Sequence, residues 1–547
     1  MGEYIIMNTY KKLFTILTGI AIIITAFAIQ SCDIKSPVEG VTVRIKNIPR
    51  TTTVRVEFID QNVGQLVTSP LNVSFGGLDA AKVISTTNEP LASTSTSIGI
   101  LNFAIADDVT PSATNPVEFV VVVKSNNYLA TSKRIIVTKP GANGFTVNMV
   151  NLNTNIPGVT SNAVSNAGST NSTTGTSAAI VASSSTSSSA VSARVTVPSG
   201  TILRDANGNA LSGTVATRVT YFDATEPASL ASFPGGFAIR DVDNNVGNFV
   251  SAGFAAIDMS VNGVEVESFS KNVDVQLDIN PNTINPETGV KIKAGDQLPL
   301  WSYDEDTGSW KNEGTYTVTA SNGPDRKLTI RKTDMTHLSW WNMDWFYDGC
   351  YNTNVKIAVD GGCWQWLYLV VEFQTPQPDV QWGYLYNGYV YSYDPVLNLM
   401  NVPDNRPVTI RAFQGWNDYY NYYYNGVDNN VGVLNVDDLC QTQDITYTLQ
   451  AATNQTGDNI DVFIRGVCPN GNVLDEGTLD VEIFKNGYWQ LAGRIVDGFI
   501  RLNCLQIGQE YQFRVYYDGE YYTESYTITS TTENIDIDLP GDNEFCE

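Results

Sequence analysis

Residues 53–58 read Thr-Val-Arg-Val-Glu-Phe, an alternation of apolar and polar side chains that decides the fold of this chain. A period of two places successive side chains on opposite faces, which predicts a β-strand with one buried face. A continuous apolar run at residues 119–123, Phe-Val-Val-Val-Val, predicts a second strand inside a sandwich core. No segment after residue 30 shows sustained helical periodicity, and glycine occurs 43 times. We therefore expect an all-β protein.

Turn residues and changes of composition divide the rest of the chain into modules. At about 100–200 residues per domain, a chain of 547 residues has room for three to five domains. Residues 153–190 contain almost only Ser, Thr, Asn, Ala, Gly and Val, which is typical of a flexible linker, with a short strand around residues 178–182 as the alternative. We expect four tandem β-sandwich domains, at 38–152, 191–347, 351–440 and 451–547.

The last two modules look like copies of each other. The tripeptide Asn-Gly-Tyr occurs at 387–389 and again at 486–488, 99 residues later. A strand-like segment follows each copy, at 409–413 in the first and at 512–516 in the second. A period near 100 residues fits one small β-sandwich per copy.

The N-terminus has the pattern of an export signal. Two lysines precede an apolar run at residues 13–29, and Cys32 follows before the sequence becomes polar. A positive n-region, an apolar h-region and a small residue before the cleavage point define a secretory signal peptide. With a cysteine after that point, residues 1–31 resemble a bacterial lipoprotein signal peptide, which implies that Cys32 receives the lipid. The alternative is an uncleaved anchor, because 17 residues lie at the lower limit for a membrane span.

Several landmarks resemble known families. The second module resembles a domain of Bacteroidota surface lipoproteins at residues 233–237, 285–289, 298–304 and 336–344. The first module, at 115–129, and the two copies resemble transthyretin-like and carboxypeptidase-regulatory-like sandwiches. These resemblances imply immunoglobulin-like or transthyretin-like sandwiches on a lipid-anchored outer-membrane protein at the cell surface, with a periplasmic orientation left open. The carboxypeptidase-regulatory-like family is structural or adhesive, which implies a role without catalysis.

Apart from Cys32, six cysteines remain, and all lie in the last 200 residues. An even number in an exported chain predicts disulfides, because the extracytoplasmic compartment is oxidising. Six cysteines allow 15 pairings, and the sequence does not choose among them. A structural zinc site is the alternative, but the CxxC spacing of such sites is absent. The disulfide candidates are Cys350, Cys363, Cys440, Cys468, Cys504 and Cys546.

The formal net charge of −25 restricts the partners. Such a charge repels nucleic acid and anionic membrane surfaces, so we expect no nucleic-acid partner and a membrane contact made by the lipid alone. The remaining candidate partners are a glycan or a surface protein.

Aromatic residues surround Asn387-Gly388. A type I′ turn at Asn387-Gly388 would place Tyr386 opposite Tyr389 and all the flanking aromatics on one face of a hairpin. Either this face packs into a core or against a neighbouring domain, or it is an exposed surface on which sugar rings or a partner protein stack. The ligand-binding candidates of this hairpin are Trp382, Tyr384, Tyr386, Tyr389, Tyr391 and Tyr393.

A second aromatic cluster precedes Asn425-Gly426. Five tyrosines in six positions cannot all point into a core if the segment is a strand, so we expect some of them to be exposed. The ligand-binding candidates of this cluster are Trp416, Tyr420, Tyr422 and Tyr424.

Catalytic signals are weak. His337 is the only histidine, lies in a segment typical of a buried strand, and excludes a zinc site with two histidines. Asp304-Glu305-Asp306 is typical of a turn, and Asp205 begins a calcium-like loop that lacks the glutamate at its twelfth position. We therefore predict no catalytic residue, metal or cofactor.

The sequence thus predicts a lipid-anchored binding or scaffolding protein that is not an enzyme. Two alternatives remain open. One is a glycan-active hydrolase that uses paired carboxylates, and the other is a purely structural spacer.

Overall fold

In the computed structural model, residues 50–538 are described, with interruptions. The interruptions are residues 87, 186–190, 321–326, 351–354, 376–382, 393, 401, 441–444, 454–455, 472, 475–477, 486, 497 and 518–519. The leader, Cys32 and Cys546 lie outside the described residues. None of the helices described is both long enough and apolar enough to span a bilayer.

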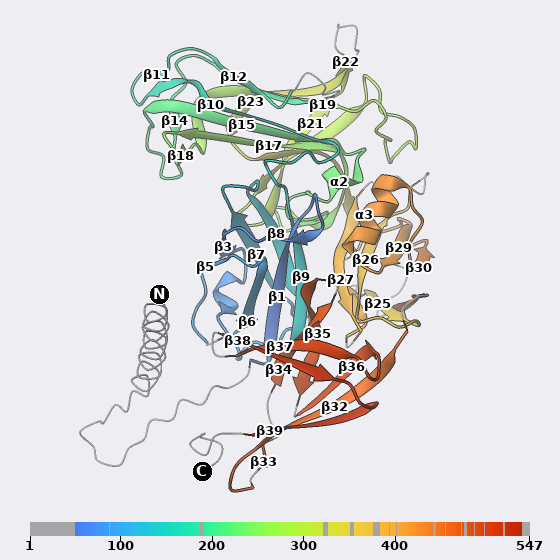
Figure 1. Ribbon diagram of the computed structural model, residues 1–547. Helices are drawn as coiled ribbons and strands as arrows, with labels where there is room; N and C mark the ends of the chain where they lie inside the picture. Colours follow the sequence, from blue (N-terminus) through green and yellow to red (C-terminus); the bar gives the residue numbers. More distant parts are fainter. Residues whose placement is uncertain are drawn as a thin grey trace, which may run out of the picture. The chain divides into compact units, whose positions relative to one another are not determined.

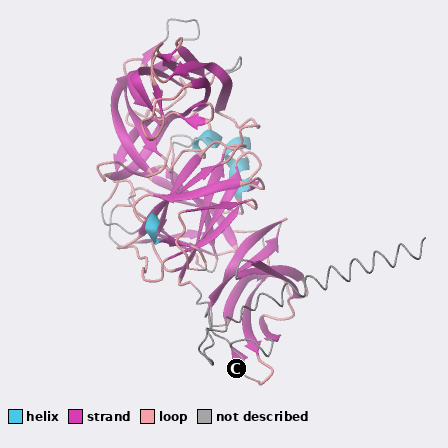
Figure 2. Cartoon of the chain, turned by 90° about the vertical axis from the view of Figure 1, so that its left-hand side faces the viewer, coloured by secondary structure: helices cyan, strands magenta, loops and turns pink. Residues whose placement is uncertain are grey.

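The all-β prediction is confirmed, because strands dominate the described chain and the helices are short (Figure 2). The first unit is a sandwich of two sheets whose inner faces share one apolar core, which includes Val56 and Val121. One sheet contains β1 (Thr52–Asp60), β2 (Gln65–Leu66), β4 (Val83–Ile84), β6 (Ile100–Ile105) and β9 (Gly141–Met149). The other contains β3 (Leu71–Gly76), β5 (Ser93–Thr96), β7 (Val117–Lys124) and β8 (Thr131–Val137).

The second unit is also built from two sheets around one core (Figure 1). Its larger sheet contains β10 (Val159–Asn171), β11 (Gly175–Thr176), β15 (Gly213–Phe222), β16 (Ala238–Arg240), β17 (Val246–Val261), β18 (Val264–Glu265), β20 (Gln297–Asp304), β21 (Ser309–Thr317) and β24 (Trp340–Asp348). Its smaller sheet contains β12 (Ile180–Ser183), β13 (Ala193–Val197), β14 (Leu203–Arg204), β19 (Ser268–Ile279), β22 (Thr319–Ala320) and β23 (Leu328–His337). Two short helices, η1 (Ala80–Lys82) and α2 (Pro227–Leu230), lie in connections of the first and second units.

The predicted linker at 153–190 is wrong for most of its length. β10 pairs with β15 from Val159, opposite Phe222, and β12 pairs with β13 near the short strand predicted as the alternative. The side chains of β10 are mostly exposed, so the strand is held by backbone hydrogen bonds. Composition describes side chains only, which is why a run of small polar residues resembled a linker.

The third unit is a sandwich closed by β31, which lies beyond the predicted boundary at residue 440. One sheet contains β25 (Val355–Asp360), β28 (Val396–Leu399) and β31 (Thr446–Gln450). The other contains β26 (Trp366–Phe373), β27 (Tyr384–Tyr391), β29 (Val408–Phe413) and β30 (Gly432–Val436).

In the C-terminal unit the described strands join into one sheet rather than two. They are β32 (Asp458–Val467), β33 (Val473–Leu474), β34 (Thr478–Lys485), β35 (Tyr488–Val496), β36 (Phe499–Leu505), β37 (Glu510–Tyr517), β38 (Glu520–Thr527) and β39 (Thr532–Asp538). β39 runs parallel to β32, as β31 does to β25 and β9 to β1. Three units therefore share one closure, in which a late strand pairs in parallel with an early strand.

The predicted hairpin at Asn387-Gly388 is wrong. β27 continues through both residues and pairs with β26 from Tyr386, opposite Val371, to Tyr391, opposite Trp366. Neither Asn387 nor Gly388 has the positive φ that a type I′ turn requires. A complete ladder with a buried neighbouring strand outweighs the local turn preference of two residues.

The second aromatic cluster is helical rather than extended. α3 (Trp416–Asn425) places Trp416, Tyr419 and Tyr423 on one buried face, at helical spacing. This face joins a cluster of aromatic side chains, including Phe222, Trp340 and Phe413, that extends from the second unit into the third.

Gly426 ends α3 in the left-handed conformation, with φ 64° and ψ 26°. A Cβ at this position would meet no atom within 4 Å, so only backbone strain opposes a substitution. We expect Gly426→Ala to lower the free energy of opening α3 by about 1–2 kcal/mol, measured by hydrogen exchange of residues 416–425. Gly426→Asn should lose less, because asparagine tolerates this conformation, and equal losses for the two variants would contradict the explanation.

Candidate functional site

The first, second and third units line a common cavity of 210 Å³. Its walls come from β8 and β9, from residues 231–238 and from β27 and β28. Sites for drug-sized ligands measure about 300–1,000 Å³, so this cavity suits a smaller molecule.

Four of the predicted ligand-binding tyrosines line this cavity: Tyr384, Tyr386, Tyr389 and Tyr391. They are not an exposed stacking surface, since Tyr384 is 5% exposed and Tyr391 is 8% exposed. Tyr384 and Tyr391 are therefore packed in the interior, whereas Tyr386 and Tyr389 are half-buried, and whether the four bind a ligand stays a prediction.

The tyrosines do not share one face of β27. Because the strand has no turn, alternation separates Tyr386, which packs into the third sandwich, from Tyr389 and Tyr391. A bulge opposite Val371 and Glu372 returns Tyr384 to the side of Tyr389.

Hydrogen bonds and ring contacts fix the tyrosine walls. Tyr386 donates its hydroxyl to the carbonyl of Tyr389 at 2.9 Å. Tyr384 packs edge-to-face on Phe237, with ring centroids 4.9 Å apart. Burial raises the pKa of both Tyr384 and Tyr386 above the usual range, so both phenols stay neutral.

Gly144 lets β9 approach β27 closely. A Cβ at this position would lie 2.7 Å from a ring carbon of Tyr391, so a larger residue would displace the Tyr391 ring. Where β9 faces β27, the cavity is therefore lined by Gly144 on one strand and by Tyr391 on the other.

Lys133 in β8 is a cavity residue that the sequence analysis missed. Its ammonium donates to the carbonyl of Thr146 at 2.8 Å, and no ion pair is recorded for it among the described residues. Burial lowers the pKa of Lys133 to about 8. The available signal was the adjacent pair Lys133-Arg134 inside an apolar strand, in a chain that is strongly acidic overall.

Asn387 brings a buried amide to the same cavity. It is 3% exposed, and its side chain faces the hydroxyl of Tyr384 without a well-formed hydrogen bond from Nδ2 to an acceptor among the described residues. An unsatisfied buried donor costs about 1–3 kcal/mol, which a ligand oxygen would recover.

The other aromatic candidates lie elsewhere. Trp416 is buried at 3% exposure in the aromatic cluster, and Tyr422 packs at its edge against Phe413. Tyr420 is half-buried on α3 and does not line the cavity. Trp382, Tyr393 and the side chain of Tyr424 lie outside the described residues.

The acidic candidates form turns or isolated groups. Asp205 accepts hydrogen bonds from the backbone of Asn207 and Asn209 at 3.0 and 2.8 Å, so its carboxylate serves its own loop. Asp304 accepts from the backbone of Asp306 at 2.9 Å in the same way. Burial raises the pKa of Glu305 to about 7, although its hydrogen bond from Trp340 opposes the shift.

His337 has a structural environment. Its ring stacks on Trp341 at 5.3 Å and its Nε2 atom lies 3.5 Å from the carboxylate of Glu313. Glu313 also accepts from Ser302. Burial alone would raise the pKa of Glu313, but these partners lower it well below the usual range.

Four of the six cysteine candidates form two disulfides, Cys350–Cys440 and Cys363–Cys504. Cys468 is disulfide-bonded as well. The zinc alternative is therefore wrong for these five residues. Asp404 and Asp438 lie close to Cys440, but an oxidised sulfur is not a thiolate ligand and this group does not form a zinc site.

The sequence of the chain has little similarity to known proteins. No family model matches the chain. Human cartilage intermediate layer protein 2 is 26% identical over 157 residues, which is 27% of this chain and 13% of that protein. The chain thus spans a small part of this curated relative.

The matches to solved structures have low sequence identities and low TM-scores. A streptococcal ancillary pilin has 9% identity and a TM-score of 0.14, covering 46% of this chain and 95% of that chain. Two B repeat units of the collagen-binding protein of Staphylococcus aureus have 10% identity and a TM-score of 0.11, covering 88% of this chain and 94% of that chain. At such scores the fold assignment rests on the strands described above.

Proposed function

We propose that this chain is a lipid-anchored scaffold at the outer membrane, facing the cell surface, and that its tyrosine-lined cavity holds a glycan. The leader and Cys32 support the anchor. The disulfides support an oxidising compartment, because such bonds rarely persist in the cytoplasm. The all-β architecture supports a rigid, non-enzymatic role.

The observation on which the scaffold proposal depends is that strong contacts tie the units together. Cys363–Cys504 joins the third unit to the C-terminal sheet. Glu118 of the first unit pairs with Arg240 of the second at 3.0 Å. Domains that move during catalysis have small polar interfaces, whereas these ties favour a fixed arrangement.

A third tie connects the first unit to the C-terminal sheet through Arg55, which is 4% exposed. Arg55 pairs with Glu57 at 2.9 Å and with Glu482 of β34. Arg514 pairs with the same Glu482 and lies 3.8 Å over the ring of Tyr521. Two cations on one buried carboxylate satisfy it fully, which a buried charge requires.

The cavity supports binding more than hydrolysis. Asp394 is the one carboxylate among its described lining residues, and it pairs with Lys139. Glycoside hydrolysis uses two carboxyl groups that face each other across the bond. We therefore favour binding over the hydrolase alternative. The burial of the tyrosines keeps the structural spacer as the second candidate function.

The anchor is tested by Cys32→Ala. We expect the variant to lose all incorporation of a palmitate analogue. It should also move from the membrane fraction to the soluble fraction, because in this proposal the lipid on Cys32 is what holds the protein to the bilayer. Ser31→Ala is the matched control and should keep both properties. A Cys32→Ala protein that stays in the membrane fraction would refute the lipid anchor.

Surface exposure is tested on intact cells with a protease added outside. We expect the wild-type chain to be cleaved without cell lysis. Protection until the outer membrane is permeabilised would show that the chain faces the periplasm.

A further inference from the structure

We infer that the cavity selects a carboxylated sugar residue of the hexuronate class, with the ammonium of Lys133 paired to the ligand carboxylate. This inference rests on the proposed glycan-binding function and specifies its ligand. Lys133 in β8 and Asn387 in β27 are the two polar groups that would recognise the ligand.

The charge of the lining selects an anion. Among the described residues the lining contains the cations Lys133, Arg134 and Lys139 and the single anion Asp394, although the whole chain has a net charge of −25. A cationic cavity in a strongly acidic protein attracts negative ligands locally.

Two of the three cations already have partners. Arg134 forms two hydrogen bonds with Glu118, at 2.7 and 2.8 Å, and Lys139 pairs with Asp394. Lys133 donates only to a neutral carbonyl, so among the described lining residues it is the one cation without a counter-ion. A ligand carboxylate would supply that counter-ion, and charge-assisted hydrogen bonds of this kind are the strong ones.

Asn387 supplies a second donor from another wall. Its buried Nδ2 atom, which faces the Tyr384 hydroxyl but forms no well-aligned hydrogen bond among the described residues, suits a hydroxyl or ring oxygen of the ligand. A ligand held by both groups spans the cavity between the first and third units.

The walls favour a sugar ring over a bare anion. Phe237, Tyr384 and Tyr391 provide apolar ring surface against which the C–H faces of a sugar pack. A volume of 210 Å³ exceeds what a small inorganic anion fills and falls below the range for drug-sized ligands. One sugar ring with a carboxylate matches the size, the apolar walls and the unpaired cation together.

The test measures binding of single sugars to the full-length protein by titration calorimetry. The probes are glucuronate, galacturonate and mannuronate, with glucose, galactose and mannose as neutral partners and acetate as a bare anion. We expect at least one hexuronate to bind about tenfold or more tightly than its neutral partner, because hydrogen bonds between charged groups are stronger than neutral ones.

Substitutions then assign the effect to Lys133. Lys133→Met should weaken hexuronate binding about tenfold or more, and Lys133→Arg should restore most of it. Lys124→Met is the matched control, because Lys124 is exposed at the end of β7 and pairs with Glu265 outside the cavity. Asn387→Asp keeps the side-chain shape and should also weaken hexuronate binding by repelling the carboxylate. Near-ultraviolet circular dichroism confirms that each variant is folded.

Each contrary result has a distinct meaning. Equal binding of hexuronates and neutral hexoses, unchanged by Lys133→Met, would overturn the inference and leave the glycan proposal intact. Lys133-dependent binding of acetate as tight as that of the hexuronates would overturn the sugar part. No binding of any hexuronate overturns the inference, and no binding of any sugar also removes the glycan part of the proposed function, while the anchor is tested separately at Cys32.

Discussion

Glu118→Gln is expected to lower the stability of the first unit by about 3–5 kcal/mol. Glu118 is 8% exposed and accepts hydrogen bonds from Arg134 at 2.7 and 2.8 Å and from Arg240 at 3.1 and 3.0 Å. A glutamine would leave two guanidinium groups facing a neutral amide, with Arg134 almost fully buried. The loss is large because uncompensated buried charge, rather than a missing contact, dominates it.

The same group gives this tie a defined pH dependence. Burial by itself would raise the pKa of Glu118, but the two arginines outweigh it and lower the pKa to about 2. A depressed pKa means that the stabilisation is complete above the unfolded-state value of 4.5 and is lost as the pH falls toward 2. The shift corresponds to roughly 3 kcal/mol, which agrees with the expected effect of the substitution.

Hydrogen exchange of the β7 amides at pH 7 and at pH 3 measures both effects. The wild-type protein should lose protection at the lower pH, and Glu118→Gln should begin lower and change less. Glu265→Gln is the matched control, because Glu265 is 61% exposed and pairs with Lys124 at 3.5 Å, so it should cost less than about 1 kcal/mol. Equal effects of the two variants would show that the buried tie is not a stabilising element.

The two Asn-Gly-Tyr tripeptides show how far local sequence determines local structure. In the C-terminal sheet, Lys485 of β34 pairs with Tyr488 of β35, so the chain reverses where the tripeptide predicts a turn. In the third unit the same tripeptide lies inside β27. The two tripeptides differ in the strand that lies beside them. In the third unit, β26 pairs with the residues of β27 before and after Asn387, which keeps the chain extended there. Such long-range pairing is invisible in a short sequence window.

The strand prediction for the tyrosine-rich segment was wrong for a different reason. Trp416, Tyr419 and Tyr423 are spaced by three and four residues, which is a helical period that the sequence displays. The strand interpretation came from the composition of a neighbourhood rich in tyrosine. The alternation at residues 53–58, by contrast, predicted β1 correctly because its period extends over the whole strand.

The cavity could be predicted only in part. The tyrosines of β27 were singled out by composition, and four of them do line the site. Lys133 and Gly144 were not, because their roles depend on β8 and β9 meeting β27 from another unit. Contacts between units are set by tertiary packing, for which a single sequence has no periodic signal.

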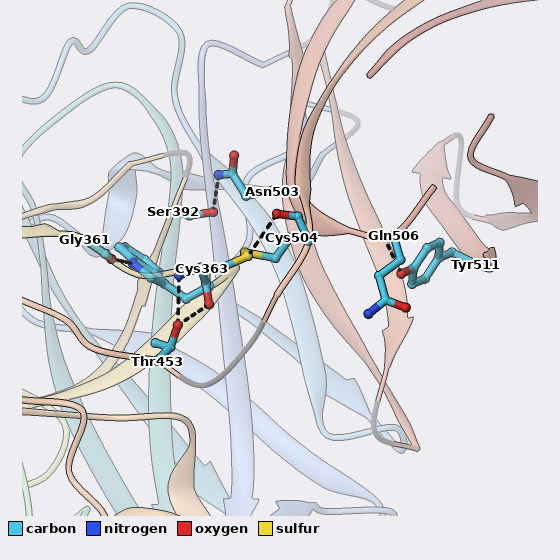
Figure 3. The surroundings of a disulfide bond; sticks show 10 residues. Gly361, Cys363, Ser392, Thr453, Asn503, Cys504, Gln506 and Tyr511 are labelled. Atoms are coloured by element: carbon cyan, nitrogen blue, oxygen red, sulfur yellow. Dashed lines mark hydrogen bonds between the residues drawn. A yellow bond between two sulfur atoms is a disulfide. The ribbon is translucent and has the colours of Figure 1, made fainter. Parts of the chain in front are cut away.

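Removal of the Cys363–Cys504 bond is expected to have the other large effect. The two residues are separated by 141 positions, and cross-linking a loop of this length stabilises by roughly 4–5 kcal/mol in the chain-entropy account. Figure 3 shows the surroundings of this bond. The Thr453 hydroxyl accepts a hydrogen bond from the backbone N–H of Cys363 at 2.8 Å and donates one to the carbonyl of Cys363 at 2.6 Å. Beside Cys504, Asn503 donates to Ser392 at 2.6 Å (Figure 3).

The double variant Cys363→Ser/Cys504→Ser avoids a free thiol and leaves the other cysteines oxidised. We expect hydrogen exchange in β36 to accelerate strongly, because the covalent tie of this strand to the third unit is then lost and only noncovalent contacts, such as those of Asn503 and Arg55, hold the C-terminal sheet to the other units. Cys350→Ser/Cys440→Ser is the matched control. It removes a bond of similar span, 90 residues, but one that closes the third unit on itself, so β36 should stay protected while β30 loses protection. If both double variants expose β36 equally, the bond between units acts only through general stability. If neither does, the ion pairs hold the C-terminal sheet without it.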